Sequence, residues 1–538
     1  MRHFLFLVVF LTGLAAQAAA APAAEAFGTL PNFYDAAISP DGKQIAIIVN
    51  IRGQYGIRVV TRGKKDEKLR AVLLGEGVKP NWVKWANDER VLVGFWQSQV
   101  FRRLPYIMSF IYTLDASSMK GKILVENEEL LRQDNSDVVD FLEDDPDHIL
   151  MAFSDRSNLL NDVNRVNVRT GRYGIIERTR QHVQRWYTDA RGEPRVGQGL
   201  VERELSQEEE WNLIIRDADE DYWRKADEYP GLDADAPIFG FTDNPNELVI
   251  GDRAGRDTLG LYVYDLVEKE ISRKLFHHDT YDARGLVTSR RDGKAIGATF
   301  VADTKETVLF EEYDTVLSRM RSRFSDYTVD YVDQSDEGQL VLFKVSNAYD
   351  PGALVIVDGS TDEVTVLTRI RRELPSEEMG LVSQVTYPAR DGFKIPAYLT
   401  VPPSVTSSAD IKNLPFIILP HGGPYARTAK RFDYFAQFFA TRGFAVLQMN
   451  FRGSAGYGES FEDAGRKNWV TMQDDVEDGT KWVVEAGLAD PDRICIAGWS
   501  YGGYAALIGA IKSPELYACA ISVSYTHLTL PTTLPRCR

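Results

Sequence analysis

Cysteine, positive charge and long apolar runs are all scarce in this chain. Three cysteines in 538 residues cannot build a disulfide framework. Cys495 and Cys519 lie in apolar, strand-like runs, where we expect each thiol to be buried and to act as a small hydrophobic group. A net charge of −16 with no basic stripe to offset it argues against nucleic acid as a partner. Beyond the N-terminus, no segment is long and apolar enough to span a membrane.

Residues 1–20 have the composition of an export signal. Arg2 and His3 form a basic start, an apolar stretch runs from Phe4 to Leu14, and Ala16-Gln-Ala18 is a small-residue cleavage pattern. An uncleaved anchor is the alternative, but the apolar stretch is short for a membrane span. We therefore expect removal of this signal peptide and export of the mature protein, to the periplasm or the cell exterior.

Short alternating strands fill residues 27–378, with no sustained helical periodicity. They are separated by turns rich in Asp, Asn, Gly and Pro. The strand-turn units recur roughly every 45 to 55 residues, which is the period of a propeller blade. Seven units predict a seven-bladed β-propeller, with a pair of β-sandwiches as the alternative. The units begin at Ile38, Trp82, Val138, Trp186, Ile238, Gly285 and Tyr327.

The pattern changes near Met379, where we place the start of a second domain, residues 379–524. Its first part predicts antiparallel edge strands, and strand and helix patterns alternate after Pro402. That alternation predicts a doubly wound α/β sheet. The predicted strands are 382–387, 389–395, 397–402, 415–419, 444–449, 493–497 and 518–524, and the predicted helices are 432–442, 474–486 and 501–511.

The most informative motif is Gly498-Trp-Ser-Tyr-Gly502, which stands between a strand pattern and a helix pattern. It has the form of the G-x-S-x-G nucleophile elbow. Ser500 has to occupy a strained backbone conformation that pushes its Oγ outward. Strand and helix then pass so close that side chains at Gly498 and Gly502 would clash. A glycine turn with an incidental serine is the alternative, which the flanking strand and helix disfavour.

A nucleophile elbow needs an oxyanion hole. We expect the backbone N–H of Tyr501 to be one donor and a loop after an earlier strand to supply the second. His421-Gly-Gly-Pro424 follows the strand 415–419, and its glycines let a backbone N–H approach an oxyanion. We therefore expect Gly423 or Gly422 as the second donor, with an ordinary Gly-Pro turn as the alternative. His421 itself is expected to orient the loop, because the catalytic base follows the serine in this chain order.

Together these motifs resemble the prolyl oligopeptidase family of serine peptidases, in which a β-propeller caps an α/β-hydrolase domain. The resemblance is strong from about Val382 to Ser524 and architectural before that. The His-Gly-Gly-Pro form is more similar to the acylaminoacyl-peptidase branch. The resemblance implies a serine peptidase that cleaves short peptides without a metal or other cofactor, and the N-terminal signal implies that it is secreted. The motifs that carry it are 389–399, 421–424, 450–458, 474–478, 490–494 and 498–503.

Three other functions are alternatives to this one. The dipeptidyl peptidases of the family bind a substrate amino terminus with paired glutamates. Here Glu208-Glu-Glu-Trp211 is the nearest acidic run, and we interpret it as a solvated helix face, so dipeptide release is not supported. An esterase on the same scaffold is the second alternative. The third is a non-catalytic binding protein that uses the propeller as its recognition surface.

The rest of a catalytic triad should follow Ser500 in the order carboxylate, then histidine. Only Glu515 and His527 follow it, and Glu515 comes too early for the orienting acid. Residues 525–538 have no helical period and are rich in Thr, Leu and Pro. We interpret them as a non-native tail on a truncated domain, with a natural divergent terminus as the alternative. We therefore expect the chain to lack the triad Asp and His and to be inactive.

Overall fold

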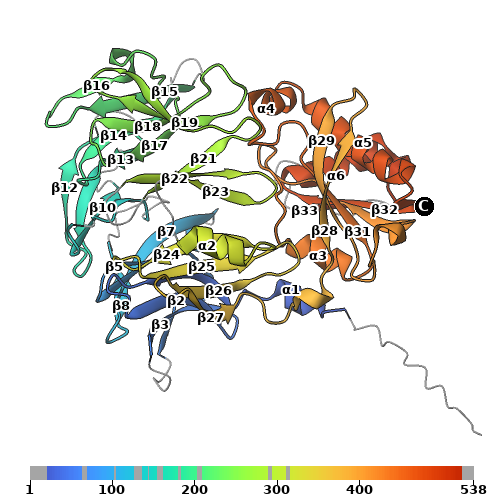
Figure 1. Cartoon of the computed structure of the whole chain (residues 1–538), viewed down its shortest axis with the longest axis horizontal. Coiled ribbons are helices and arrows are strands. Elements are labelled where there is room, and N and C mark those ends of the chain that lie inside the picture. The colour runs from blue at the N-terminus through green and yellow to red at the C-terminus, as the bar shows by residue number, and fades with distance from the viewer. Residues whose placement is uncertain are drawn as a thin grey trace, which may run out of the picture.

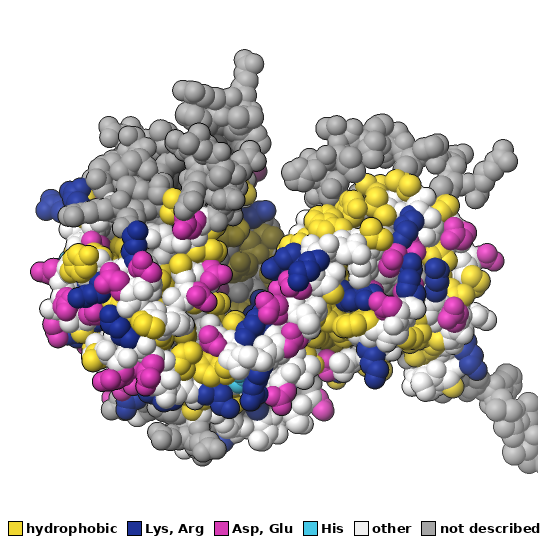
Figure 2. Space-filling view, turned by 90° about the horizontal axis from the view of Figure 1, so that it is seen from above, with side chains coloured by type: hydrophobic (Ala, Val, Ile, Leu, Met, Phe, Trp, Pro, Cys, Tyr) yellow, Lys and Arg dark blue, Asp and Glu magenta, His cyan; other side chains and the backbone are white. Residues whose placement is uncertain are grey.

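The computed structural model describes residues 21–63, 70–101, 104–126, 136–142, 144–153, 161–179, 183–202, 209–288, 294–310 and 316–523. Residues 1–20, Ser524 and residues 525–538, which include the predicted signal peptide and tail, lie outside the described residues. The described residues form a propeller and an α/β domain (Figure 1). The surface is hollowed between these two lobes (Figure 2). Among these residues, no helix is both long and apolar enough to cross a membrane.

Seven antiparallel sheets follow one another from Phe33 to Arg369 and form the propeller (Figure 1). Within the described ranges, six sheets have four strands and the sixth in chain order has three. Each predicted repeat unit falls at the first two strands of one sheet, so the prediction of a seven-bladed propeller is confirmed. The strands of the first three blades are β1 (Phe33–Ile38), β2 (Gln44–Ile51), β3 (Gln54–Thr61), β4 (Ala71–Leu73), β5 (Val78–Asn87), β6 (Arg90–Phe101), β7 (Leu104–Asp115), β8 (Gly121–Ile123), β9 (Val138–Asp140), β10 (His148–Ala152), β11 (Val163–Asn167) and β12 (Tyr173–Glu177). Those of the last four are β13 (Arg185–Thr188), β14 (Pro194–Glu202), β15 (Glu209–Arg216), β16 (Trp223–Lys225), β17 (Ile238–Phe241), β18 (Glu247–Asp252), β19 (Gly260–Asp265), β20 (Glu270–Phe276), β21 (Ala283–Thr288), β22 (Ala295–Val301), β23 (Lys305–Leu309), β24 (Thr328–Gln334), β25 (Leu340–Ser346), β26 (Ala353–Asp358) and β27 (Glu363–Arg369).

Acidic side chains join neighbouring blades at the innermost strands. Asp333 on β24 of the last blade accepts a hydrogen bond of 3.0 Å from the backbone N–H of Ile38 on β1 of the first. An apolar cluster that includes Ile38 and Leu342 fills the same junction. Asp35 on β1 accepts a bond of 2.8 Å from the N–H of Val83 on β5 of the second blade. The ring therefore closes by packing and by these carboxylate bonds.

The Asp35 junction predicts a pH dependence of stability. Burial raises the pKa of Asp35 to about 6, and the Asp333 carboxylate adds to the rise while the backbone bond from Val83 opposes it. The native carboxyl then binds its proton more tightly than the unfolded one, so the free energy of unfolding should fall as pH rises from about 4 to about 6. Two pKa units correspond to at most about 3 kcal/mol.

Asp35→Asn should remove this part of the pH dependence, because the amide oxygen can still accept the Val83 bond. The measurement is urea unfolding of the propeller at several pH values between 4 and 7. If the free energy of unfolding of the Asn variant depends on pH as steeply as that of the parent chain, Asp35 does not titrate in this range.

Glu209, Glu210 and Trp211 belong to strand β15, so the expectation of a helix face is wrong there. Glu208 lies outside the described residues. The run from Trp211 to Ile215 supplies aromatic and branched side chains, and Trp211 pairs with Leu200 on β14. Cross-strand packing of this kind outweighs the helix propensity of glutamate.

Six strands form the α/β sheet in the order β28-β29-β31-β30-β32-β33. β28 and β29 make an antiparallel hairpin at one edge, and β31, β30, β32 and β33 run parallel to one another. The predicted strands 389–395 and 397–402 are instead a turn followed by one strand, since Gly392 N–H bonds back to the Ala389 carbonyl. The strand bounds are β28 (Val382–Pro388), β29 (Lys394–Thr400), β30 (Leu414–Ile418), β31 (Ala445–Met449), β32 (Ala489–Trp499) and β33 (Cys519–Val523).

Helices pack on both faces of this sheet. Ala436 of α3 joins an apolar cluster with Ile417 and Val446 on one face. Val476 of α5 and Ala505 of α6 join the larger cluster on the other face. The helix bounds are α1 (Ala24–Gly28), α2 (Val316–Arg323), α3 (Tyr434–Ala440), α4 (Glu459–Arg466), α5 (Trp469–Glu485) and α6 (Tyr501–Lys512), with short 3₁₀ turns at Ala226–Glu228, Ser376–Glu378, Ser408–Asp410 and Pro514–Leu516.

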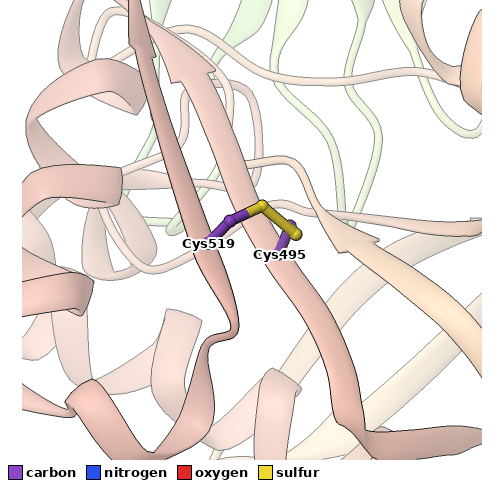
Figure 3. The surroundings of a disulfide bond; sticks show 2 residues. All are labelled: Cys495 and Cys519. Carbon is purple, nitrogen blue, oxygen red and sulfur yellow. A yellow bond between two sulfur atoms is a disulfide. The ribbon is translucent and has the colours of Figure 1, made fainter. Parts of the chain in front are cut away.

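A disulfide joins Cys495 on β32 to Cys519 on β33 (Figure 3). The two residues are direct partners in the parallel pair, with Cα atoms 4.7 Å apart. The prediction of two separate buried thiols is therefore wrong. Cys519 is exposed and Cys495 half-buried. The sheet order brings together residues that are 24 positions apart in sequence.

Loss of this disulfide should destabilise the α/β domain. Replacing both Cys495 and Cys519 by alanine is expected to cost about 2–4 kcal/mol, because the unfolded chain regains freedom. Calorimetry should show a lower melting temperature for this domain in the double variant than in the parent chain. A reductant should lower the melting temperature of the parent chain by a similar amount. The double variant itself is the control, since reductant should leave its melting temperature unchanged. Equal melting temperatures of parent and variant would contradict the expectation.

Candidate active site

Two loops meet at the carboxyl ends of β30 and β32, which are neighbouring parallel strands. The loop His421–Pro424 follows β30, and Ser500 follows β32 directly. From β30 the chain passes through α3 to β31 on one side, and it returns through α5 to β32 on the other. Such a reversal of strand order opens a crevice between the two loops, where α/β proteins bind their ligands.

Ser500 has a left-handed backbone conformation, with φ of 55° and ψ of −125°. Its N–H donates to the Val523 carbonyl of β33 over 3.0 Å, and its own carbonyl accepts from Tyr504 over 3.1 Å as α6 begins. The residue is exposed. The backbone is therefore held on both sides while the hydroxyl faces solvent, which is the strained geometry of a nucleophile elbow.

Glycine is required on both sides of Ser500. A Cβ atom on Gly498 would lie 2.4 Å from the backbone carbon and oxygen of Gly502. One on Gly502 would lie 2.3 Å from the Pro420 carbonyl oxygen. Strand β32, helix α6 and the end of β30 thus pack backbone against backbone.

The loop after β30 brings Gly422 beside the serine. A Cβ atom on Gly422 would lie 3.4 Å from the Cβ of Ser500. Gly423 has a φ of 128° and precedes Pro424 through a cis peptide bond. A Cβ on Gly423 would meet the backbone nitrogen of Tyr425 at 2.7 Å, so this turn also needs glycine. The space that a side chain on Gly422 would need therefore borders Ser500.

The first N–H groups of α6 have no carbonyl partner within the helix, as at any helix N-terminus. Tyr501, the predicted donor, is the first residue of α6. Its ring packs against Phe451 and Trp469, with centroids 5.3 and 5.7 Å away. The Tyr501 side chain is therefore directed into the domain, and its backbone N–H is presented at the elbow.

His421 is fixed by contacts at both ring nitrogens. Nδ1 lies 2.7 Å from the Gly422 carbonyl oxygen, and Nε2 lies 2.9 Å from Ser454 Oγ. The ring stacks on Phe451 at 4.4 Å. Burial lowers the pKa of His421 to about 4, so the ring is neutral at pH 7. A carbonyl only accepts, so Nδ1 carries the proton. The Ser454 hydroxyl beside Nε2 donates to the Phe451 carbonyl over 2.6 Å. This geometry agrees with a loop-orienting role.

Buried polar groups under the loop had no role assigned from sequence. Arg452 pairs with Asp475 through a 2.6 Å contact, and both side chains are buried. Asn450 accepts from Thr428 N–H over 2.7 Å and donates to the Tyr457 hydroxyl over 2.8 Å. The motifs 450–458 and 474–478 marked these residues in the sequence, but their pairing depends on the fold.

Arg427, in the segment that follows the glycine loop, anchors the α/β domain to the propeller. Its guanidinium donates to the carbonyls of Val301 and Ala302, at the end of β22, over 2.9 and 2.8 Å. It also lies 3.9 Å from the ring centroid of Tyr457. The glycine loop and the propeller are thus linked through one side chain.

The structure describes four of the seven histidines. His148, His277 and His278 belong to the propeller, and His421 is engaged as described above. No hydrogen bond joins the Ser500 hydroxyl to a histidine within the described ranges. His527, the one histidine after Ser500, lies outside them.

The fold and the elbow define an α/β-hydrolase domain carried with a β-propeller. Residues 430–531 match the model of the prolyl oligopeptidase family, which confirms the family expected from the sequence motifs. The matched range runs past the predicted break at Tyr525. The nucleophile-bearing domain is thus similar, over residues 430–531, to the prolyl oligopeptidase family of serine peptidases.

Similarity extends over most of the chain. It is 26% identical to dipeptidyl aminopeptidase BIII of Pseudoxanthomonas mexicana, over 97% of this chain and 77% of that protein. The fold is similar to prolyl oligopeptidase B of Galerina marginata, with a TM-score of 0.62 at 15% identity over 92% of this chain and 73% of the other. It is also similar to an acylaminoacyl peptidase of Pyrococcus horikoshii, with a TM-score of 0.58 at 14% identity over 92% and 77%.

The elbow contact predicts a strong effect at Gly498. In Gly498→Ala the added Cβ meets backbone at 2.4 Å, so strand or helix has to shift. Overpacking of this kind costs roughly 1–3 kcal/mol or more, which should lower the melting temperature of the α/β domain. Gly174→Ala on β12 is the matched control, because nothing lies within 4 Å of its added Cβ. Similar melting temperatures for the two variants would mean that the backbone contact is not tight.

Proposed function

We propose that this chain is the propeller and nucleophile-bearing part of an exported serine peptidase that cleaves short peptides through an acyl-enzyme on Ser500. The observation that carries the proposal is the strained, exposed Ser500 at the start of α6, with Gly422 beside it. The match to the prolyl oligopeptidase family supports a peptidase over an esterase. The intact elbow and glycine loop disfavour a purely binding role.

In this reaction the Ser500 hydroxyl attacks the carbonyl carbon of the scissile peptide bond. A base takes the hydroxyl proton and returns it to the leaving amine, and water then hydrolyses the acyl-enzyme. The backbone N–H of Tyr501 and one from Gly422 or Gly423 stabilise the oxyanion. Donors of this kind typically contribute 10²–10³-fold in rate each.

The base and its orienting carboxylate are proposed to be absent from this chain, which would then be inactive. Both ring nitrogens of His421 are engaged elsewhere. Glu515 lies on an exposed 3₁₀ turn directly after α6. The order carboxylate, then histidine, places the two groups after the serine, where only Glu515 and His527 are available. These observations support the proposal together.

The propeller is proposed to limit access to short peptides. Two contacts hold the propeller against the α/β domain. Arg427, which follows the glycine loop, donates to the Val301 carbonyl of the propeller, and Ser460 N–H donates to the Asp257 carboxylate of the propeller over 2.8 Å. A folded protein cannot enter the hollow between lobes that are held together in this way. Export is supported by the disulfide, since such bonds persist in oxidising compartments.

Release of dipeptides from the amino terminus is a second candidate specificity. It is favoured by the similarity to a dipeptidyl aminopeptidase over 97% of this chain. Peptides that differ only in amino-terminal acetylation separate the two candidates. Dipeptide release requires the free amine, whereas cleavage within short peptides does not.

The nucleophile assignment predicts the effect of Ser500→Ala. In a chain extended through its native reading frame beyond Ser524, the substitution should lower peptide hydrolysis by several orders of magnitude, because the acyl-enzyme no longer forms. The measurement is kcat/KM on a short fluorogenic peptide. Ser522→Ala, on the neighbouring strand β33, is the control and should retain activity. Equal activity of the Ser500→Ala enzyme would rule out Ser500 as the nucleophile.

The 538-residue chain is expected to react poorly with a fluorophosphonate probe, which labels activated serines. Without a base, the Ser500 hydroxyl keeps its proton and is a weak nucleophile. Mass spectrometry after incubation should find Ser500 unmodified. Strong labelling that disappears in His527→Ala would show instead that the C-terminal residues supply the base.

A further inference from the structure

A cavity of about 510 Å³ lies at one end of the propeller's central channel. The residues that line it lie at the beginnings of four innermost strands, β9, β13, β17 and β21. Each of these strands contacts the next in that order. Trp186 and Phe239 supply aromatic walls, and Arg185, Arg284 and Asp137 supply the charged groups. The lining therefore places charged groups beside aromatic rings.

The cavity lies at the face of the propeller that meets the α/β domain. Asp282, directly before β21, accepts from Gly458 N–H over 3.1 Å. Arg284 Nη2 lies 4.0 Å from the position of a Cβ on Gly456. The same loop begins at Ser454, which contacts His421 of the glycine loop. The cavity therefore borders the loop from Ser454 to Gly458 of the α/β domain.

Arg185 and Arg284 have no ion-pair or hydrogen-bond partner among the described residues, and both are exposed. Other arginines at this face are engaged: Arg427 donates to propeller carbonyls, and Arg253 lies 3.6 Å from Asp282. The lining carries two guanidinium groups against the one carboxylate of Asp137. A locally positive site in a chain of net charge −16 attracts an anion that the rest of the surface repels.

We propose that Arg185 and Arg284 form a subsite that binds a carboxylate of the peptide substrate, at a distance from the bond cleaved at Ser500. The proposal rests on the peptidase function proposed above. A guanidinium binds a carboxylate through two parallel hydrogen bonds, and the free forks of these arginines are available for that geometry. Phe239, which is half-buried, packs against the neighbouring peptide side chain. The carboxylate is supplied by the peptide C-terminus or by an acidic side chain.

Peptide binding to the full chain tests this subsite without requiring catalysis. Four peptides of sequence Ala-Ala-Phe-Ala-X-Ala, all with free amino termini, combine X as Glu or Gln with a free or amidated C-terminus. Affinities are measured by isothermal titration calorimetry in a Ser500→Ala background, so turnover cannot contribute. The variants are Arg284→Gln, Arg185→Gln and the double substitution. Arg256→Gln is the matched control, because Arg256 pairs with Asp279 and does not line the cavity.

The double variant should bind the carboxylate-bearing peptides at least about tenfold more weakly, with no change for the amidated Gln peptide. Dependence on the free C-terminus or on Glu identifies the source of the carboxylate, and either result supports the subsite. Circular dichroism checks that the variants fold.

Equal affinities in parent and double variant, an equal loss for the neutral peptide, or no binding of any peptide to the parent would each overturn the subsite. Failure of the peptidase function is a separate result. It would appear as the absence of Ser500-dependent hydrolysis in the extended chain.

Discussion

The site depends on one contact between backbones, where helix α6 crosses the end of strand β32. Gly498 and Gly502 approach so closely that any side chain at Gly498 would meet backbone at 2.4 Å. Because the two glycines lie so close, the chain between them has to turn through a positive φ at Ser500. The same crossing sets the Tyr501 N–H at the start of α6 and brings Gly422 against the serine. The geometry expected of nucleophile and oxyanion donors therefore follows from two glycines.

A second constraint links the active-site loops to the propeller. Arg427 follows the glycine loop and donates to the carbonyls of Val301 and Ala302. His421 holds the other side of that loop through Ser454. The loop is therefore fixed between its own domain and blade six. Docking of the propeller therefore also fixes the position of the loop.

The features that could be predicted from the sequence are those that a local residue pattern determines. The elbow was visible because glycine spacing, strand and helix occur within one short segment, and the blades because the same turn chemistry recurs seven times. The disulfide, the strand at Glu209–Trp211 and the Arg427 anchor were not predicted, because each depends on a partner that only the assembled fold brings near. Helix α4 also escaped prediction, because Glu459–Arg466 is only eight residues long and buries only Phe461 and Gly465.

The most direct test of the central claim is a crystal structure of the extended chain with a peptidyl phosphonate. The account predicts a covalent bond from Ser500 Oγ to phosphorus. It also predicts a phosphonate oxygen within about 2.7–3.1 Å of the backbone nitrogens of Tyr501 and of Gly422 or Gly423. A phosphonate attached to another residue, or an oxygen directed away from both N–H groups, would contradict it.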